Sequence, residues 1–565
     1  MSELLFQYEK VNPTTWAYLS SLLMVGLYFK FSRFWSVRNL DLVLLILLAP
    51  GLLLAYYGQE SAQVTWVTLQ QARATFTERK AEADAAAEEA RAKPAAATRE
   101  TAAASTSVPA TAPRGDLAAE PSSKPAADEK PVSDLPADGA LAASDPPPVV
   151  SGQNGELREE VADAAEEDDS PLAVAERALV VAEKAWQKAR WVTAGGFMAL
   201  LFVGGIFLVR LLLDPTMARR PLLEPNLSTG GLIFIACSMF VFLMANVITS
   251  VPTDDDLQGP RGAAALLSRE TLPKNENDLA RHGPGYAVLN LLPSVPTMSL
   301  LNQPSDSKNA QDVYAIVAKV MAILAHFAVV FGIVTVGYRH FDNLKMGIGA
   351  AALYLMLPYT ALMTGRIDHI LPAALLLWAI VCYRRPLLAG IFIGLAAGVV
   401  YYPVFLLPLW LSFYWQRGIW RFLGGVSATL CLMILSLLFV STDFAEFQGN
   451  VQKMFGLWFP ARQGLGGIWG LGWDPVYRLP VLAAFIAISG TLAIWPAQKN
   501  LGTLLSCSAA IMVATQFWHP HGGGIYVAWY LPLMLLTIFR PNLEDRVALT
   551  VLAESWFARR DRKAA

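Results

Sequence analysis

The sequence predicts an all-α, polytopic transmembrane helical bundle, and two observations support this prediction. The chain of 565 residues is 54% hydrophobic and only 16% charged, with a mean hydropathy of +0.40. A soluble protein of this length needs more charge to cover its surface. The apolar residues also form blocks close to the roughly 20 residues with which a helix crosses the hydrocarbon core of a bilayer.

These blocks predict about twelve or thirteen membrane-spanning helices. The N-terminal sequence MSELLFQYEK lacks the basic region of a signal peptide, so we expect the first block to remain as a span. Around Tyr401–Pro403, two short helices and one long bent helix both fit the sequence. The expected spans are 14–31, 39–58, 192–213, 230–249, 312–337, 347–363, 370–383, 387–402, 404–415, 422–440, 479–496, 501–517 and 525–540.

Lysines and arginines in the short loops predict the orientation of these spans, because cytoplasmic loops carry an excess of both. If Tyr401–Pro403 marks an outward turn, every short basic loop falls on the same, inner side, which favours thirteen crossings. The basic residues of that side are Lys30, Arg33, Arg38, Arg219, Arg220, Arg339, Lys345, Arg384, Arg385, Arg417, Arg421 and Lys499. The outer side then holds 59–191, 250–311, 441–478 and the turns 364–369 and 518–524.

Composition divides the chain into an N-terminal two-span hairpin (1–58), an outer insertion (59–191), a transmembrane core (192–540) and a basic cytoplasmic tail (541–565). Within the insertion, 94–170 is too poor in apolar residues to fold. The segments on either side of it repeat every seven residues and predict two helices packed as an antiparallel hairpin. The repeating positions are Leu69, Phe76, Ala83 and Ala90, then Leu172, Leu179 and Trp186 with Ala175, Ala182 and Ala189. This stalk is either a docking site for a partner protein or a tolerated insertion.

Three adjacent aspartates, Asp254, Asp255 and Asp256, follow directly after an expected span. Their mutual repulsion could raise the pKa of one of them and make it a general base, or their oxygens could hold a divalent cation. Alternatively, an aspartate caps the next helix, expected from Leu257 to Arg269, near the positive end of its dipole. A cap accounts for one aspartate but not for three.

The outer turn between two otherwise uncharged spans carries Arg366, Asp368 and His369. Burial of such groups at a bilayer edge is costly unless they pair or face water, which makes them candidates for a functional site. The alternative is an interfacial turn in which Asp368 is a helix N-cap and the Arg366 side chain reaches to the interface.

A glycine-rich outer loop carries Lys453, Arg462 and Trp473. Cations between aromatic rings suit a phosphate or a sugar, whereas tryptophans alone are typical of an aromatic belt at the membrane interface. A later turn carries His519 and His521, which cannot share a helix face and have no third ligand at a clear spacing, so zinc is weakly supported. A substrate-binding turn and a plain loop both fit these histidines.

Several protein classes are excluded. No phosphate-binding loop, serine-hydrolase elbow, HExxH motif or dinucleotide fingerprint occurs in a suitable context. The four cysteines lie inside apolar blocks without metal or disulfide spacing, and we interpret them as small buried hydrophobic residues. We expect no nucleic-acid partner.

Three stretches of the segment 230–540 carry a family resemblance: Met363–Pro372, Arg384–Ala396 and His521–Pro532. They are similar to a Gly-Gln-x-Asp/Asn turn, a Gly-Leu-Ala helix and a Tyr-x-x-Trp-x-x-Pro span. These belong to the GT-C superfamily of integral-membrane glycosyltransferases, in its bacterial polyprenol-phosphate-dependent mannosyl- and arabinosyltransferase-like branch. The chain departs from that branch at Tyr401-Tyr402, where a lysine is usual, and at Arg366, where glutamine is usual.

The resemblance implies transfer of mannose, or of another hexose or pentose, from a polyprenyl-phosphate donor to an extracytoplasmic polysaccharide, glycolipid or protein. It implies a multi-pass protein of the bacterial inner (cytoplasmic) membrane. An aspartate of Asp254–Asp256 would be the catalytic base, and Arg366, Lys453 or Arg462 would balance the leaving phosphate. The other substrate-binding candidates are Asp368, His369, Trp473, His519 and His521. A divalent metal is compatible with this chemistry, and the sequence assigns it no ligands.

A second class of function is a non-catalytic scaffold, or a transporter-like component, of envelope polysaccharide assembly. Transporters place charged groups near mid-bilayer, and here only Lys319 and His326 are candidates for such positions. That pattern disfavours transport and leaves the scaffold open, with the stalk at 59–191 as its main support.

Overall fold

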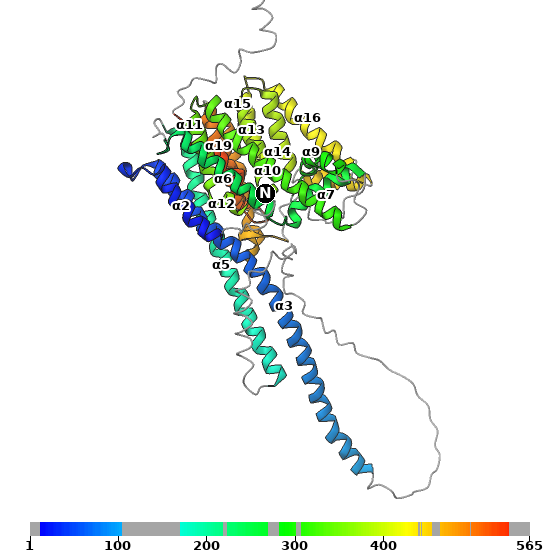
Figure 1. The fold of residues 1–565 in the computed structure, drawn as a ribbon. Helices are drawn as coiled ribbons and strands as arrows, with labels where there is room; N and C mark the ends of the chain where they lie inside the picture. The colour runs from blue at the N-terminus through cyan, green and yellow to red at the C-terminus, as the bar shows by residue number, and fades with distance from the viewer. Residues whose placement is uncertain are drawn as a thin grey trace, which may run out of the picture. The chain divides into compact units, whose positions relative to one another are not determined.

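The computed structural model describes residues 12–103, 170–217, 223–268, 282–300, 307–438, 441, 443–454, 464–497 and 499–541, except the side chains of 91–103, 298–300, 307–310 and 453–454. These residues form helices and no strand, with one isolated β-bridge between Gly466 and His521 (Figure 1). The all-α bundle predicted from the sequence is therefore confirmed. Nearly all of the expected tail, 542–565, lies outside the described residues.

The helices that matter for the site follow one another in a simple order. The first half contains α2 (Pro13–Tyr28), α3 (Val37–Ala103), α5 (Pro171–Leu213), α6 (Thr229–Thr249), α7 (Asp254–Ser268), α9 (Pro284–Leu300) and α10 (Ser307–Arg339). The second half contains α11 (Leu344–Met356), α12 (Pro358–Leu362), α13 (Ile367–Val381), α14 (Pro386–Val399), η3 (Tyr402–Leu406), α15 (Leu407–Tyr414), α16 (Ile419–Leu438), α17 (Phe444–Met454), α18 (Arg478–Ile494), α19 (Leu501–Trp518), η6 (Val527–Trp529) and α20 (Leu531–Phe539).

Seven of the described helices are long and apolar enough to cross a membrane, fewer than the twelve or thirteen spans expected from the sequence. They are Val37–Ala90, Pro171–Thr216, Thr229–Thr249, Gln311–Arg339, Ile419–Leu438, Pro475–Ile494 and Leu501–Trp518. The apolar segments Leu344–Met356, Ile367–Val381, Pro386–Val399 and Tyr402–Tyr414 are shorter. Of the two possibilities at Tyr401–Pro403, the structure shows two separate short helical segments.

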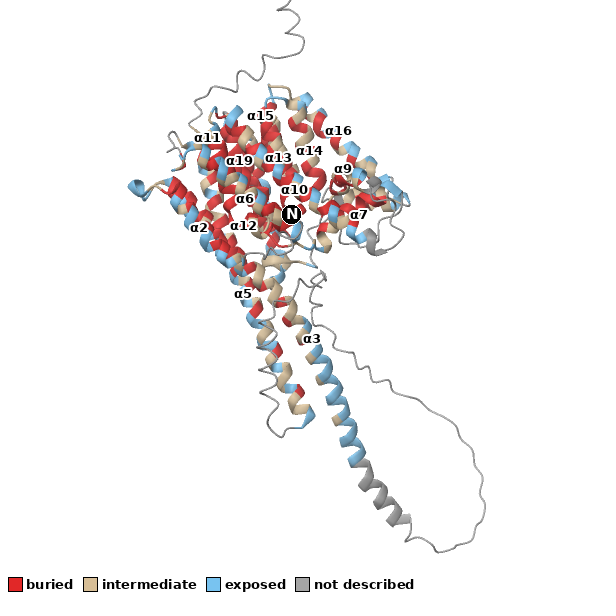
Figure 2. Cartoon of the chain, in the orientation of Figure 1, coloured by how far each residue is buried: buried red, intermediate tan, exposed pale blue. Residues whose placement is uncertain are grey.

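Two of the shorter helices, α11 and α13, and the longer α19 are enclosed by protein. Nearly every residue of α11 and α13 is buried, and α19 is buried along almost its whole length (Figure 2). A helix that neighbouring helices enclose has its polar backbone groups shielded from hydrocarbon, so it need not match the full bilayer thickness. Helix length in this core is therefore set by packing.

The chain has two compact units. One is formed mainly by Met1–Gln59 and Trp191–Ala565, and the described residues of the other lie within Glu60–Ala140 and Pro147–Arg190. In the second unit the rings of Trp66 and Trp186 lie 5.3 Å apart. Four of the predicted repeat positions are buried there, namely Leu69, Ala175, Ala182 and Ala189.

The boundary expected for the unfolded linker is wrong at its start. Helix α3 continues to Ala103, into the segment 94–170 that the composition predicts to be unstructured. Five of the ten residues 94–103 are alanine, which has high intrinsic helix propensity. The residues 104–169 lie outside the described part of the chain.

Glycines let α14 and α16 approach closely. A Cβ atom at Gly390 would meet the carbonyl oxygen of Phe422, and one at Gly425 would meet that of Leu387. Small residues at such positions allow two membrane helices to pack backbone against backbone. The contact lies in the N-terminal half of α14, whose other end borders the pocket described below.

We expect Gly425→Ala to lower the free energy of unfolding by about 1–3 kcal/mol, because the added methyl group pushes α14 and α16 apart. The neighbouring Gly424→Ala is a matched control, since a Cβ there has nothing within 4 Å and alanine favours the helix. The measurement is the thermal unfolding of both variants in detergent. Equal stability of the two variants would contradict the close packing.

A buried network of charges joins the N-terminal helices to the C-terminal end of the core. Arg210 on α5 lies 3.1 Å from Asp41 on α3 and 2.9 Å from Asp214. Asp214 is 0% exposed and also pairs with Arg540, which follows α20, at 2.6 Å. None of these four residues stands out in the sequence, because each lies at the edge of an apolar block. Together they connect segments from opposite ends of the chain.

Candidate functional site

The three aspartates form the first turn of α7, which begins at Asp254 rather than at the expected Leu257. The backbone amide and the hydroxyl of Thr253 both donate to Asp256 Oδ2, at 3.1 and 2.7 Å. An acidic residue three positions after the cap, bonded back to it, stabilises the first turn of a helix. Asp256 therefore bonds back to Thr253, which precedes the helix, and is not itself the N-cap. This contact leaves the roles of Asp254 and Asp255 open.

Arg366 contacts carboxylates of two helices, α7 and α13. Its Nη2 lies 3.1 Å from Asp255 Oδ2, and its Nε lies 3.2 Å from Asp368 Oδ1 and 3.8 Å from Asp256 Oδ1. Its Nη2 also donates to Asp368 Oδ2 at 3.2 Å, which makes the contact with Asp368 bidentate. The start of α7 and the start of α13 are thus held together by one guanidinium group.

The pKa values of the two most buried carboxyls of this cluster, Asp256 and Asp368, are shifted in opposite directions. Burial raises the pKa of Asp256, and the nearby Arg366 only partly offsets that effect. For Asp368, in the first turn of α13 and ahead of its apolar stretch, burial is outweighed by Arg366, which holds the pKa well below its usual value. Asp256 Oδ1 has no hydrogen-bond partner among the described residues. The pKa values of these two carboxyls are therefore shifted in opposite directions beside the same arginine.

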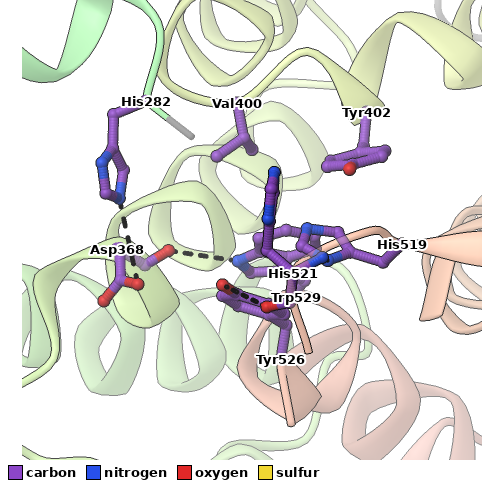
Figure 3. Close-up of a pocket in the computed structure, with 8 residues that line it drawn as sticks. All are labelled: His282, Asp368, Val400, Tyr402, His519, His521, Tyr526 and Trp529. Carbon is purple, nitrogen blue, oxygen red and sulfur yellow. Dashed lines mark hydrogen bonds and ion pairs between the residues drawn. The ribbon is translucent and has the colours of Figure 1, made fainter. Parts of the chain in front are cut away.

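A pocket of about 320 Å³ lies beside this cluster, with Asp368 in its wall (Figure 3). Its lining combines one carboxylate, three imidazoles and three large aromatic rings. The lining residues are His282, Asp368, Val400, Tyr402, His519, His521, Tyr526 and Trp529. His282 points toward Asp368, with its Nε2 3.9 Å from Asp368 Oδ2. A polar group in a mostly aromatic cavity is the usual composition of a small-molecule site.

His282 is placed by a close backbone contact. The amide of Gly283 donates to the carbonyl of Val399 at 2.8 Å, and a Cβ at Gly285 would lie 2.6 Å from the carbonyl carbon of Gly398. This contact brings the start of α9 against the end of α14. The His282 Nδ1 then lies 3.0 Å from Gln258 Oε1 on α7. The imidazole is therefore fixed from two sides with Nε2 toward the pocket.

The opposite wall consists of stacked aromatic rings. The rings of Tyr526 and Trp529 are stacked at 24° with centroids 4.4 Å apart, and the ring of Tyr526 lies 4.6 Å from those of both His369 and His519. The indole of Trp529 donates to the backbone carbonyl of Asp368 at 3.2 Å. Tyr402 lies 4.9 Å from His519. Aromatic faces of this kind suit the apolar C–H faces of a sugar ring.

The structure brings together most of the residues singled out in the sequence. Asp255, Asp256 and Arg366 lie in the cluster, with Asp368 and His369 in the first turn of α13. His519 and His521 lie across the pocket, where Gly466 of the glycine-rich loop donates to the carbonyl of Pro520 at 2.7 Å. Two loops that are separated in the sequence by α18 and α19 therefore meet at the histidine turn.

Other candidates fall elsewhere. Asp254 pairs with Arg261 at 2.8 Å, and its side chain is 41% exposed. Trp473 is 54% exposed and does not line the pocket. Only the backbone of Lys453, within α17, is described, and Arg462 lies outside the described residues.

Five pocket residues are not among the site candidates from the sequence: His282, Val400, Tyr402, Tyr526 and Trp529. Three of these residues lie at positions to which the family resemblance refers. Tyr402 stands where the GT-C branch usually has a lysine, and Tyr526 and Trp529 belong to the Tyr-x-x-Trp-x-x-Pro span. His282 has no such signal in the sequence, because its place depends on the contact of Gly283 with Val399.

The suggestion of a divalent metal gains no support from this geometry. Among the described residues, no group of three His, Cys, Asp or Glu is arranged to hold a metal ion. The aspartates that could supply oxygens are engaged by arginines, Asp254 by Arg261 and Asp255 by Arg366.

The fold and the pocket define a multi-pass integral membrane protein with a polar site among its helix ends. Residues 311–537 match the family model of Glycosyltransferase family 87, a family of GT-C-type membrane glycosyltransferases. The resemblance to the GT-C superfamily is thus confirmed, and the protein is a membrane glycosyltransferase. The match covers less than half of the chain and begins after the aspartates of α7 and His282. No curated protein and no solved structure gives a significant match.

Proposed function

We propose that this glycosyltransferase moves a sugar from a polyprenyl-phosphate donor to a hydroxyl group of an extracytoplasmic acceptor, and that Asp368 is the catalytic base. The observation that supports it best is the position of Asp368, which is the one carboxylate among the described residues that line the pocket. A general base must first lie within hydrogen-bonding distance of the proton that it accepts, and its pKa is considered after that.

In the proposed reaction the acceptor oxygen attacks C1 of the donor sugar. The bond between C1 and the phosphate oxygen breaks, its electron pair leaves with the polyprenyl phosphate, and the hydroxyl proton passes to the Asp368 carboxylate. Tyr402, Tyr526 and Trp529 would stack against the sugar and acceptor rings. An ionised carboxylate in this wall would also stabilise positive charge that develops at C1.

Arg366 has a positioning role in this proposal. Its guanidinium group already contacts Asp255, Asp256 and Asp368, so its charge is shared among three carboxyls. It keeps Asp368 ionised and fixes its direction. The contacts to the leaving phosphate would instead come from His519 and His521 on the opposite wall.

We further propose that the site faces out of the cytoplasm, in a bacterial inner membrane. Loops that are basic in the sequence contact one another: Arg417 donates to the carbonyl of Lys499 at 3.3 Å, and His340 lies 3.0 Å from that of Val381. These contacts support a single basic face. Because cytoplasmic loops of membrane proteins carry an excess of Lys and Arg, that basic face would be cytoplasmic.

The direct test uses the full-length protein in liposomes with polyprenyl-phosphate mannose or arabinose, radiolabelled in the sugar, and a bacterial membrane glycolipid extract as acceptor. We expect label to leave one of these donors and to appear in a product of slower chromatographic mobility, with release of polyprenyl phosphate. Consumption of a sugar nucleotide, with both lipid donors left intact, would contradict the proposed donor class.

A further inference from the structure

A histidine that precedes the family match faces the carboxylate of the pocket. His282 lies before α9, and its Nε2 is 3.9 Å from Asp368 Oδ2 in the pocket wall (Figure 3). That separation is longer than a hydrogen bond, so the two atoms are not bonded directly to each other. A bound hydroxyl group can lie within hydrogen-bonding distance of both.

The plane of the His282 ring is fixed by stacking. The ring of Tyr286, on α9, lies within 18° of parallel to it, with centroids 4.6 Å apart. Tyr286 is buried, and a Cβ at Gly259 would lie 2.9 Å from its ring, so α7 packs tightly against it. Together with the contact of Gln258 at Nδ1, this packing keeps the Nε2 of His282 directed at the pocket.

The contact at Nδ1 determines which nitrogen of His282 carries the proton. His282 Nδ1 lies 3.0 Å from Gln258 Oε1, and the amide nitrogen of Gln258 lies 3.5 Å from Asp255 Oδ1. The Asp255 carboxylate, which pairs with Arg366, can only accept, so the amide turns its NH2 group to Asp255 and its oxygen to His282. That oxygen requires an N–H at Nδ1. A neutral imidazole has one N–H, so Nε2 is an acceptor.

The pocket therefore presents two acceptors side by side, an oxygen of Asp368 and a ring nitrogen of His282. Two neighbouring acceptors are satisfied by a ligand with two neighbouring donors, and a buried acceptor left unpaired costs free energy. Adjacent hydroxyl groups of a sugar ring provide such a pair of donors. An isolated hydroxyl, such as that of a serine side chain, provides one.

We propose that His282 determines the specificity for the acceptor: its Nε2 accepts a hydrogen bond from the hydroxyl next to the one that Asp368 deprotonates. Gln258 is a positioning residue that holds His282 in the required tautomer. The inference rests on the proposed function for the role of Asp368. It narrows the acceptor to a carbohydrate with two adjacent hydroxyls, and it assigns acceptor recognition to α7 and the start of α9, before the matched segment 311–537.

The first experiment follows sugar transfer to octyl mannoside and to its analogues that each lack one hydroxyl. We expect His282→Phe to lower kcat/KM for octyl mannoside about tenfold, as for one lost hydrogen bond, and to have no effect with the analogue that lacks the hydroxyl bound by Nε2. His282→Gln should recover part of the loss, because its amide oxygen can accept in place of Nε2. Gln258→Met should show the same dependence on the acceptor.

The matched control is His340→Phe. It removes an imidazole that also contacts an aromatic ring, Tyr383 at 4.8 Å between centroids, but does not line the pocket. It should not discriminate between octyl mannoside and any analogue. An equal loss with every acceptor in His282→Phe would indicate a purely structural role and overturn the proposal.

A second measurement does not depend on activity. The six histidines are labelled with ¹⁵N, and the signals of His282 in liposomes at neutral pH are identified by their absence in His282→Phe. We expect a protonated Nδ1, an unprotonated Nε2, and a change in the Nε2 shift when octyl mannoside is added. A protonated Nε2, or no change with octyl mannoside, would overturn the inference. If the shift changes but no lipid donor supports transfer, the proposed function fails while the hydroxyl site at His282 stands.

Discussion

Replacement of Asp368 by asparagine should lower sugar transfer by about 10²–10⁴-fold, the usual range for removal of a general base. Asparagine has nearly the same shape and keeps the backbone carbonyl that Trp529 contacts at 3.2 Å. The loss would therefore come from the missing charge and proton acceptor. The measurement is the initial rate of label transfer from the polyprenyl-phosphate donor, with thermal unfolding in detergent as a check that the variant folds.

The matched control is Asp254→Asn, because Asp254 is paired with Arg261 and exposed outside the pocket. It should retain nearly all activity. Since Arg366 holds the pKa of Asp368 well below its usual value, protonation of this group should not limit the wild-type rate down to about pH 5. An active Asp368→Asn enzyme, together with an inactive Asp255→Asn or Asp256→Asn enzyme, would move the base to α7.

Replacement of Asp214 by asparagine should destabilise the folded protein by about 3–5 kcal/mol. Asp214 is 0% exposed and contacts both Arg210 and Arg540, so its neutralisation leaves buried positive charge without a full counter-charge. The measurement is the free energy of unfolding in mild detergent, from denaturant titration or from thermal unfolding. Activity per folded molecule should be unchanged, because this network does not line the pocket.

The control for Asp214 is Glu82→Gln, which removes an ion pair with Arg79 whose side chains are 57% and 46% exposed. Exposed pairs contribute about 0–1 kcal/mol, so little change is expected. The double variant Asp214→Leu with Arg540→Met should recover part of the lost stability, because it removes both buried charges. If Asp214→Asn is no less stable than Glu82→Gln, the network does not stabilise the fold.

The sequence predicts the class of fold because membrane burial leaves a strong compositional pattern. It also singles out Arg366, Asp368 and His369 as candidates for a functional site. Burial of three ionisable residues between apolar spans costs free energy unless they pair or face water. The sequence does not predict their partners. The contact of Arg366 with Asp255 joins two helices, and such a contact depends on packing rather than on spacing.

The three aspartates have different arginine partners, and this difference shows the same limit of prediction from sequence. On α7 the residue seven positions after Asp254 is Arg261, which lies on the same helix face and pairs with it. Asp255 and Asp256 are rotated toward Arg366. The spacing of Asp254 and Arg261 could have been noticed in the sequence, but the direction of the other two requires the position of α13.

Among the described residues, fewer helices are long enough to cross a membrane than the sequence has apolar segments, and this difference has a physical reason. A sequence pattern of apolar residues is the same whether a helix borders lipid or is enclosed by other helices. Helices α11 and α13 belong to the second kind, and their lengths follow their neighbours. Only the burial of each helix on all sides separates the two cases.

The pairing of Asp214 with Arg540 also has a consequence for biosynthesis. Asp214 is inserted early, whereas Arg540 follows the last helix of the described chain and leaves the ribosome late. Because a chain is synthesised from its N-terminus, the counter-charge for Asp214 is incomplete until Arg540, 326 residues later, has been added. A chain that stopped before Arg540 would keep this imbalance inside the membrane, and we expect it to be less stable than a chain that contains Arg540.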